Sequence, residues 1–357
     1  MTCTVATRLL RPTQYLARTT RTLTSASRFF EAPTVSVPPR TSTANPITPP
    51  PTRTFSSVKM SKSVAAASHA DFHRASLFDL KGRVALVTGG GSGIGLMITQ
   101  ALAVNGAKVY IVGRTGEKLD TVVSTYNKDI EGEIIPLQGD VTKKEDVARL
   151  VKEIESREQC LCILVNNAGV SSNTVQPESG SAAEMKQNLF DTDKTTAKDW
   201  TDTYEGDVVS IYFMTSAFLP LLQKSSERHP HWSGTVINIT SISGLVKGAQ
   251  HHFAYNAAKA AATHLTRMLA GEIASAGHKI RVNALAPGVF PSEMTAGESD
   301  EYQKSHLEKS KYEGKVPAGR PGRDIDMAQG VLSLACNQYI DGQTLVVDGG
   351  YTLSMGQ

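Results

Sequence analysis

The chain lacks most of the features that mark secreted and membrane-spanning proteins. Its 357 residues include only four cysteines, none in C-x-x-C spacing, which argues against a disulfide framework and implies a reducing compartment. Its apolar runs are too short and too interrupted to span a bilayer. We therefore expect no membrane span.

Two of the cysteines, Cys160 and Cys162, flank a short apolar run in which alternate residues share one face of a strand. Paired thiols can bind metal, but the neighbouring sequence adds no cluster of histidines or further cysteines. We interpret both as buried structural thiols and expect no metal site.

Acidic residues are almost missing from the first sixty positions. Of 37 basic and 34 acidic residues in the chain, eight and one lie there, which leaves 29 basic and 33 acidic residues in the remainder. The net charge of +3 is thus the sum of a strongly basic segment, residues 1–60, and a mildly acidic remainder. An acidic remainder argues against a nucleic-acid surface.

The segment 1–58 is rich in Ser, Thr, Arg and Pro and has no continuous apolar stretch of the secretory type. This composition is typical of a mitochondrial transit peptide, and Arg53-Thr-Phe-Ser56 resembles a cleavage site of the matrix processing peptidase. We predict a disordered mitochondrial targeting extension over 1–58 and a linker over 59–79. The alternative is a non-targeting extension, with translation from Met60 and a cytoplasmic protein.

From residue 80 to the end, continuous apolar strands alternate with helical patterns. Such βα units predict one α/β domain over 80–357, a doubly wound parallel sheet of Rossmann type with helices on both faces. We expect strands at 83–88, 108–112, 134–138, 162–165, 235–239, 280–285 and 344–347, and helices that include 142–157, 198–222 and 254–275. Two insertions, 171–197 and 290–318, follow strands, and the second contains an expected short helix at 298–311. Because ligands bind beyond the carboxyl ends of parallel strands, both insertions are candidates for the substrate pocket.

A glycine-rich turn, Thr88-Gly-Gly-Gly-Ser-Gly-Ile-Gly95, joins the first strand to the next helix. Gly89 permits a tight turn, Gly93 lets backbone amides approach a pyrophosphate, and Gly95 lets the helix pack close to its strand. The phosphates would then lie at the positive N-terminus of the helix.

A second pattern, Tyr255-x-x-x-Lys259, lies about 160 residues downstream. The two side chains share one helix face. A free phenol ionises only well above neutral pH, and a nearby ammonium favours the phenolate. Together the glycine turn and this pair predict a nicotinamide-dependent enzyme in which Tyr255 exchanges the proton.

The end of the second strand indicates which nicotinamide cofactor binds. NAD sites place an acid there, but the sequence reads Val112-Gly-Arg-Thr115. Arg114 can bind a 2′-phosphate through its guanidinium fork, although a solvated surface arginine is the alternative. We expect NADP(H).

The span 78–352 resembles the short-chain dehydrogenase/reductase family. The resemblance rests on the glycine turn, on Asn166-Asn-Ala-Gly169, on Ser241 with Tyr255 and Lys259, on Pro287-Gly288, and on Asp348-Gly-Gly350. Within the family, 286–295 resembles the 3-oxoacyl reductases of the rhamnolipid type. With the motifs above, the resemblance implies that the cofactor contacts Thr88, Gly89, Ser92, Gly93, Ile94, Gly95, Arg114, Asp140, Val141, Asn167, Tyr255, Lys259, Val289 and Ser292.

The resemblance also implies that Ser241 binds the substrate oxygen and that Lys259 holds the nicotinamide ribose. Asp140 would face the adenine, although as a lone acid it could equally cap the helix that begins near Thr142. Asp207 stands where the family normally carries an asparagine that holds a water linked to the catalytic lysine. Its charge would raise the pKa of Lys259 and weaken the effect of the lysine on Tyr255, unless the side chain faces solvent.

These features predict an NADPH-dependent reductase that acts on a small-molecule carbonyl substrate, a 3-oxoacyl chain or similar ketone. We also expect a homo-oligomer. The alternatives are an alcohol dehydrogenase that runs oxidatively, a tailoring reductase for a specialised metabolite, and a weakened enzyme that binds cofactor as a regulator. The substrate itself is set by the two insertions.

Overall fold

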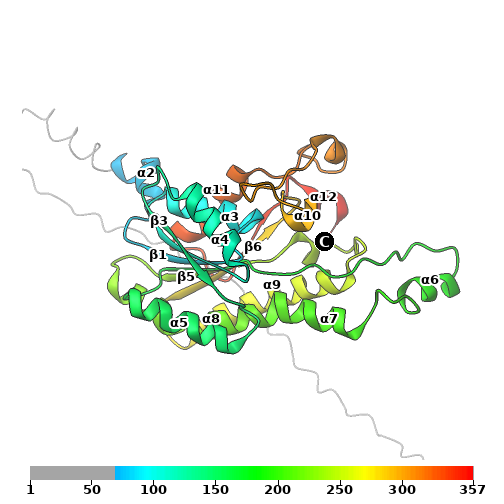
Figure 1. Ribbon diagram of the computed structural model, residues 1–357, viewed down its shortest axis with the longest axis horizontal. Coiled ribbons are helices and arrows are strands. Elements are labelled where there is room, and N and C mark those ends of the chain that lie inside the picture. The colour runs from blue at the N-terminus through cyan, green and yellow to red at the C-terminus, as the bar shows by residue number, and fades with distance from the viewer. Residues whose placement is uncertain (1–68, 357) are drawn as a thin grey trace, which may run out of the picture. The chain divides into compact units, whose positions relative to one another are not determined.

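The computed structural model describes residues 69–356 (Figure 1). Their centre is a seven-stranded sheet in which all neighbouring strands are parallel, in the order β3-β2-β1-β4-β5-β6-β7. The predicted doubly wound parallel sheet is therefore confirmed. The strands are β1 (Val84–Thr88), β2 (Lys108–Gly113), β3 (Glu133–Gln138), β4 (Ile163–Asn166), β5 (Gly234–Ile239), β6 (Ile280–Pro287) and β7 (Thr344–Val347).

Helices cover both faces of the sheet (Figure 1). The core on one face is formed with α3 (Gly93–Val104), α4 (Gly116–Tyr126) and α11 (Asp324–Cys336). The core on the other face is formed with α5 (Lys144–Arg157), α8 (Ser210–Arg228) and α9 (Phe253–Ser275). The shorter helices are α2 (Arg74–Leu77), α6 (Ala182–Leu189), α7 (Ala197–Tyr204), α10 (Glu293–Ala296) and α12 (Tyr351–Met355), with 3₁₀ turns at Ile242–Gly244 and Lys309–Tyr312.

The central strands are mostly apolar and are buried along their whole length because both of their faces are covered. Every residue of β1, β4, β5 and β6 is buried. A strand with one face in solvent would alternate apolar and polar residues. The near-continuous apolar runs therefore predicted a sheet between two helical layers. The chain adds β2 and β3 on one side of β1 and then crosses back to add β4 on the other side. Parallel α/β proteins bind ligands at such a switch point, beyond the carboxyl ends of the strands.

The predicted helix over 298–311 is wrong. This segment contains turns and a 3₁₀ turn at its end, Lys309–Tyr312. The Asp300 carboxylate accepts hydrogen bonds from the backbone N–H groups of Tyr302 and Lys304, both at 2.9 Å. Gln303 between them takes a left-handed φ of 60°. Such side chain–backbone bonds compete with helix formation, and the apolar pattern gave no sign of them.

The single long helix predicted over 198–222 is interrupted. A π-helical turn, Glu205–Val209, separates α7 from α8, and α8 continues to Arg228. The other insertion, 171–197, contains α6, which the sequence did not predict.

The predicted transit segment, 1–58, and the first part of the linker, 59–68, lie outside the described residues. The described end of the linker contains α2. Within 69–356, no helix is both long and apolar enough to cross a membrane.

Candidate active site

The glycine turn after β1 leaves the start of α3 open. The chain turns at Gly89 with φ of 64°, and α3 begins at Gly93. The side chain of Ser92, which precedes the helix, makes no capping bond to it. A Cβ on Gly95 would lie 2.0 Å from the carbonyl oxygen of Gly89, so only glycine fits there. Free N–H groups at a helix start, with a close backbone approach, suit a pyrophosphate.

A cavity of about 370 Å³ lies beside this turn. Its wall brings together the turns that follow β1 and β4 with residues of β2, β5 and α9, which are far apart in sequence. Twelve of the predicted site residues line it: Gly89, Ser92, Gly93, Ile94, Gly95, Arg114, Asp140, Val141, Asn167, Tyr255, Lys259 and Ser292. The glycine turn and the Tyr–Lys pair therefore belong to one site.

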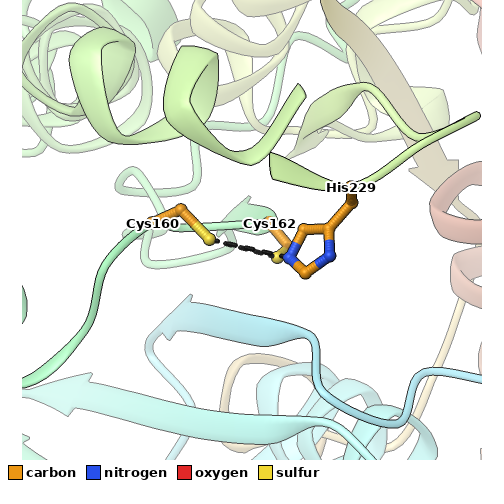
Figure 2. A group of neighbouring side chains, drawn as sticks. All are labelled: Cys160, Cys162 and His229. Carbon is orange, nitrogen blue, oxygen red and sulfur yellow. Dashed lines mark hydrogen bonds between the residues drawn. The ribbon is translucent and has the colours of Figure 1, made fainter. Parts of the chain in front are cut away.

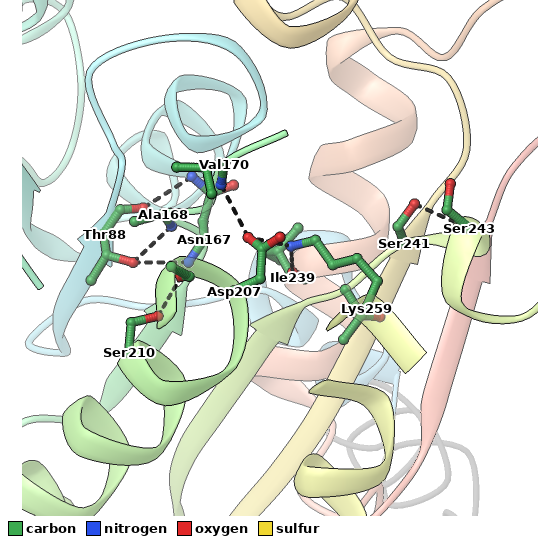
Figure 3. A network of polar contacts seen from close by, with 12 residues as sticks. Thr88, Asn167, Ala168, Val170, Asp207, Ser210, Ile239, Ser241, Ser243 and Lys259 are labelled. Carbon is green, nitrogen blue, oxygen red and sulfur yellow. Dashed lines mark hydrogen bonds and ion pairs between the residues drawn. The ribbon is translucent and has the colours of Figure 1, made fainter. Parts of the chain in front are cut away.

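Four predicted residues lie outside this wall. Thr88 supports the wall indirectly. Its Oγ1 accepts hydrogen bonds from the backbone N–H groups of Asn167 (2.9 Å) and Ala168 (3.0 Å), and these bonds join the ends of β1 and β4 (Figure 3). Val289 instead lines a smaller cavity of about 150 Å³. Ser241 and Asp207, the other two, are described below.

At the end of β2, Arg114 is exposed and lines the cavity. Lys118, on the first turns of α4, lines it too and was missed from the sequence. Its Nζ lies 2.5 Å from Oε1 of Glu293, which comes from the insertion after β6. The Lys118 ammonium holds the pKa of the Glu293 carboxyl below its ordinary value. A basic residue one turn after Arg114 is the signal that would have identified Lys118.

Asp140 lies in a turn before α5. Its Oδ1 accepts hydrogen bonds from the N–H (3.0 Å) and the hydroxyl (2.8 Å) of Thr142. The residue that caps α5 is Lys143, so Asp140 does not occupy the N-cap position. Asp140 remains a residue of the cavity wall.

Tyr255 and Lys259 project from the first turns of α9. The Lys259 Nζ lies 5.5 Å from the centre of the Tyr255 ring and donates to the carbonyl oxygen of Ile239 at 3.3 Å. Lys259 is only 4% exposed, whereas Tyr255 is half-buried. Ser241 follows β5 and is buried; its Oγ accepts from the backbone N–H of Ser243 at 3.1 Å (Figure 3). Its hydroxyl hydrogen is free to be donated elsewhere.

Asp207 lies against Lys259 and not in solvent. Its side chain is fully buried, and its Oδ1 lies 3.3 Å from Nζ of Lys259 (Figure 3). The same oxygen accepts from the backbone N–H of Val170 at 3.1 Å. Asp207 stands in the π-helical turn, and π turns are frequent at functional sites because the extra residue redirects a side chain. The amphipathic pattern of 198–222 could not show this turn.

The two members of this ion pair shift each other's ionisation. Burial opposes the charge of Lys259, but attraction to Asp207 and a smaller contribution from Tyr255 outweigh it and raise the lysine pKa above its ordinary value. Burial raises the pKa of the Asp207 carboxyl, against the opposing effect of Lys259. The pair therefore raises the affinity of Lys259 for its proton. In return it keeps a carboxylate charge buried, which is costly.

Gly169, which follows β4, lies directly against the Asp207–Lys259 ion pair. A Cβ at position 169 would lie 2.3 Å from Oδ1 of Asp207 and 3.3 Å from Nζ of Lys259. The ion pair thus occupies the space that any side chain at position 169 would need.

Comparison with known proteins identifies the family of this site. A family model described as short chain dehydrogenase matches residues 83–303. The chain belongs to the short-chain dehydrogenase/reductase family. A short-chain dehydrogenase/reductase of Diaporthe leptostromiformis, PhomF, is 40% identical over 282 aligned positions, and the alignment covers 77% of this chain and 93% of the relative.

Two further members of the short-chain dehydrogenase/reductase family bear on the reaction. The rhamnolipids biosynthesis 3-oxoacyl-[acyl-carrier-protein] reductase of Pseudomonas aeruginosa is 34% identical over 279 residues, covering 77% of this chain and 98% of that protein. The solved Pseudomonas aeruginosa RhlG/NADP active-site complex superposes with a TM-score of 0.62 at 33% identity, covering 77% of this chain and 98% of that one. The predicted similarity to the rhamnolipid-type reductases is confirmed.

Proposed function

We propose that this short-chain reductase uses NADPH to reduce a ketone of the 3-oxoacyl type, with Tyr255 as the proton donor. The main observation behind the proposal is that the glycine turn, Arg114, Tyr255 and Lys259 all line the same cavity. The similarity to a 3-oxoacyl reductase supports the substrate class.

Three features of the chain support NADP(H) as the cofactor. Arg114 and Lys118 place two cations in the cavity wall near the end of β2, where NAD-dependent relatives carry an acid. The open start of α3 suits the pyrophosphate. A similar solved structure is a complex with NADP. When bound, the reduced nicotinamide supplies the hydride.

The residues of the chain would then control the proton and the charge on the substrate oxygen. The hydroxyl of Ser241 donates a hydrogen bond to the carbonyl oxygen and stabilises the negative charge that develops on it. Tyr255 gives its phenolic proton to that oxygen. The buried Lys259 ammonium stabilises the phenolate left behind, and Asp207 keeps the lysine charged.

The substrate would enter beside the insertion 171–197. The backbone N–H of Val175 donates to the carbonyl oxygen of His251 at 2.9 Å, and Glu178 Oε1 lies 3.0 Å from Nε2 of the same histidine. His252 packs edge-on to Tyr255, with ring centres 6.3 Å apart. The insertion is thus held close to the catalytic tyrosine, where differences in its sequence can select the substrate.

A carbonyl panel with NADPH oxidation as the readout tests the proposal. The panel contains 3-oxoacyl thioesters of several chain lengths, simple ketones and, for the reverse direction, alcohols with NADP⁺. We expect the thioesters to be reduced fastest, and Tyr255→Phe to lower turnover by about 10²–10⁴-fold while cofactor binding stays nearly unchanged, because the phosphates and ribose are held elsewhere. Tyr339→Phe is the control, because the Tyr339 side chain is 99% exposed. Tight NADPH binding without turnover on any carbonyl would instead support the regulatory alternative.

We also propose that residues 1–58 direct the protein to mitochondria. The support is their composition, with eight basic residues and one acid in the first sixty positions. A fluorescent reporter fused to residues 1–60 should enter mitochondria and be cleaved near Ser56. A cytoplasmic, uncleaved reporter would contradict targeting and leave the proposed reaction untouched.

Self-association through α7 and α8 is a further part of the proposal. Trp200, Tyr204 and Tyr212 on these helices are each between 43% and 49% exposed, and aromatic side chains are enriched at protein interfaces. We expect a dimer or tetramer by analytical ultracentrifugation. A monomer at micromolar concentration would contradict this.

A further inference from the structure

Two thiols and an imidazole meet at the end of the sheet opposite the cavity. The Sγ atoms of Cys160 and Cys162 lie 4.0 Å apart, and Nε2 of His229 lies 3.7 Å from Sγ of Cys160 (Figure 2). The three atoms lie within 4.8 Å of one another. Among the described residues, this is the one group of three such side chains with metal-ligand spacing.

The fold brings the histidine to the thiols across nearly seventy residues of sequence. Cys160 and Cys162 lie just before β4, and His229 directly follows α8. The backbone N–H of Leu161 donates to the carbonyl oxygen of Leu221 on α8 at 3.1 Å, which fixes the helix against the strand entry. The predicted burial of both thiols is confirmed, but one histidine accompanies them in space, which the neighbouring sequence could not show because it does not reveal how α8 packs.

Two of the three distances between the ligand atoms match the edges of a tetrahedral zinc site, and the third, between Cys162 and His229, is within 4.8 Å. With Zn–S of about 2.3 Å and Zn–N of about 2.0–2.1 Å, a tetrahedral centre separates two sulfurs by about 3.8 Å and a sulfur from a nitrogen by about 3.6 Å. The observed separations of 4.0 and 3.7 Å differ from these values by a few tenths of an ångström at most. A disulfide requires about 2.05 Å between the sulfurs, so its formation would demand a much larger movement.

The charges of the three ligands also suit a divalent cation. Two thiolates and a neutral imidazole carry a net charge of −2, so Zn²⁺ makes the centre neutral overall. Neutrality matters because both cysteines are at most 4% exposed, and an isolated buried charge is costly. Of the neighbouring charged groups, the Glu158 carboxylate favours a cation at this place and the Arg228 guanidinium opposes it.

We propose that Cys160, Cys162 and His229 form a zinc site, with a solvent molecule as the fourth ligand. His229 is partly exposed, which gives the ion a path from solvent. The site lies at the amino end of β4, whereas the active-site cavity lies beyond the carboxyl ends of the strands. The ion would tie the end of α8 to the start of β4 and take no part in the reaction.

Metal analysis of the full chain, with any affinity tag removed, tests the proposal. Protein equilibrated with Zn²⁺ and then desalted should retain about one zinc per chain by mass spectrometry, and its melting temperature should rise with added Zn²⁺. Co²⁺ in place of zinc should give a thiolate-to-metal charge-transfer band and the strong visible bands of a tetrahedral centre. Cys162→Ser and His229→Gln should each abolish the retained zinc and the cobalt spectrum.

Cys336→Ser is the matched control, because Cys336 is the other described cysteine and lies outside the group. It should retain zinc as the unaltered chain does. The site variants should keep the NADPH-dependent turnover of the unaltered chain, so failure of the zinc site and failure of the proposed reaction are distinguishable. Folded, active protein without retained zinc or a cobalt spectrum would overturn the site. So would equal loss of zinc in Cys336→Ser, or a native chain lighter by two hydrogens through a Cys160–Cys162 disulfide.

Discussion

Asp207 and Lys259 form an ion pair 3.3 Å long in which the carboxylate is fully buried and the lysine nearly so. The carboxylate has little else to bind: its Oδ1 accepts from Val170, and its Oδ2 has no hydrogen-bond partner among the described residues. A buried pair with an unsatisfied oxygen is a poor source of stability. Because Lys259 Nζ lies 5.5 Å from the centre of the Tyr255 ring, we infer that the main effect of Asp207 is on the charge of the lysine beside the catalytic tyrosine.

The first prediction is that Asp207→Asn shifts the alkaline limb of the pH–rate profile to lower pH. Attraction to Asp207 raises the lysine pKa against the effect of burial. Without the carboxylate, only the smaller contribution of Tyr255 opposes burial, which favours the neutral amine, so Lys259 loses its proton at lower pH. An ammonium no longer paired with a carboxylate also favours the Tyr255 phenolate, which moves the limb in the same direction.

Steady-state rates with NADPH and one fixed ketone across the pH range provide the measurement. Asp202→Asn is the control, because Asp202 lies on neighbouring α7 in an exposed pair with Lys198. Coinciding profiles for Asp207→Asn and the unaltered chain would show that the carboxylate does not tune the site.

The second prediction concerns stability. Lys259→Met leaves the buried Asp207 carboxylate without its cation and should lower the free energy of unfolding by about 3–5 kcal/mol at neutral pH. The double variant with Asp207→Asn should recover most of the loss, because no buried charge remains. Chemical denaturation of the single and double variants measures both effects.

The pH dependence of this loss has a definite sign. Burial already raises the folded-state pKa of Asp207, and removal of Lys259 raises it further. The folded state of Lys259→Met then binds a proton that the unfolded state lacks, so the deficit is full above the folded pKa and shrinks as the pH falls through it. A deficit independent of pH would attribute the loss to packing.

The third prediction is that Arg114→Ala weakens NADPH binding by about 1.5–3 kcal/mol and leaves NADH binding unchanged, since only NADPH offers a 2′-phosphate to the guanidinium. Fluorescence titration with both cofactors provides the measurement. Arg157→Ala, which removes an exposed arginine on α5, should change neither. Equal losses for the two cofactors would mean that Arg114 does not read the phosphate.

The fourth prediction is that Glu293→Gln tightens NADPH binding by about two- to fivefold. The carboxylate lines the cavity and holds Lys118 at 2.5 Å, so its loss removes a repulsive charge and frees a cation for the phosphates. The pair is about 40% exposed, which keeps the effect small. Glu298→Gln, an exposed carboxylate five residues away, should leave the affinity unchanged. Weaker binding in Glu293→Gln would show that the pair instead supports the cofactor pocket.

The sheet and most of the cavity wall were predictable because their signals are local. A buried parallel strand is mostly apolar, and a phosphate-binding turn must contain glycine at fixed positions, so both leave patterns within a few residues. The order of the motifs then assigned Tyr255 and Lys259 to the same edge of the sheet as Gly89. No packing information was needed for that step.

The remaining features depend on contacts between distant segments. The π turn that brings Asp207 to Lys259 joins α7 directly to α8, so the sequence favoured one continuous helix there. The Lys118–Glu293 pair joins residues 175 positions apart. His229 reaches the two thiols only because α8 ends beside the entry of β4. The wrongly predicted helix over 298–311 has a local cause instead. The backbone N–H groups of Tyr302 and Lys304 donate to the Asp300 carboxylate, and these bonds prevent the helix that the sequence favoured.

The space around Gly169 has a consequence for the mutational tolerance of the gene. Every other amino acid carries a Cβ, and here that atom would come within 2.3 Å of the Asp207 carboxylate. Even alanine, the mildest replacement, must push the carboxylate away from Lys259 before it disturbs the sheet. A saturation library selected for activity should therefore retain glycine alone at position 169, whereas a library selected only for soluble expression should admit the smaller residues.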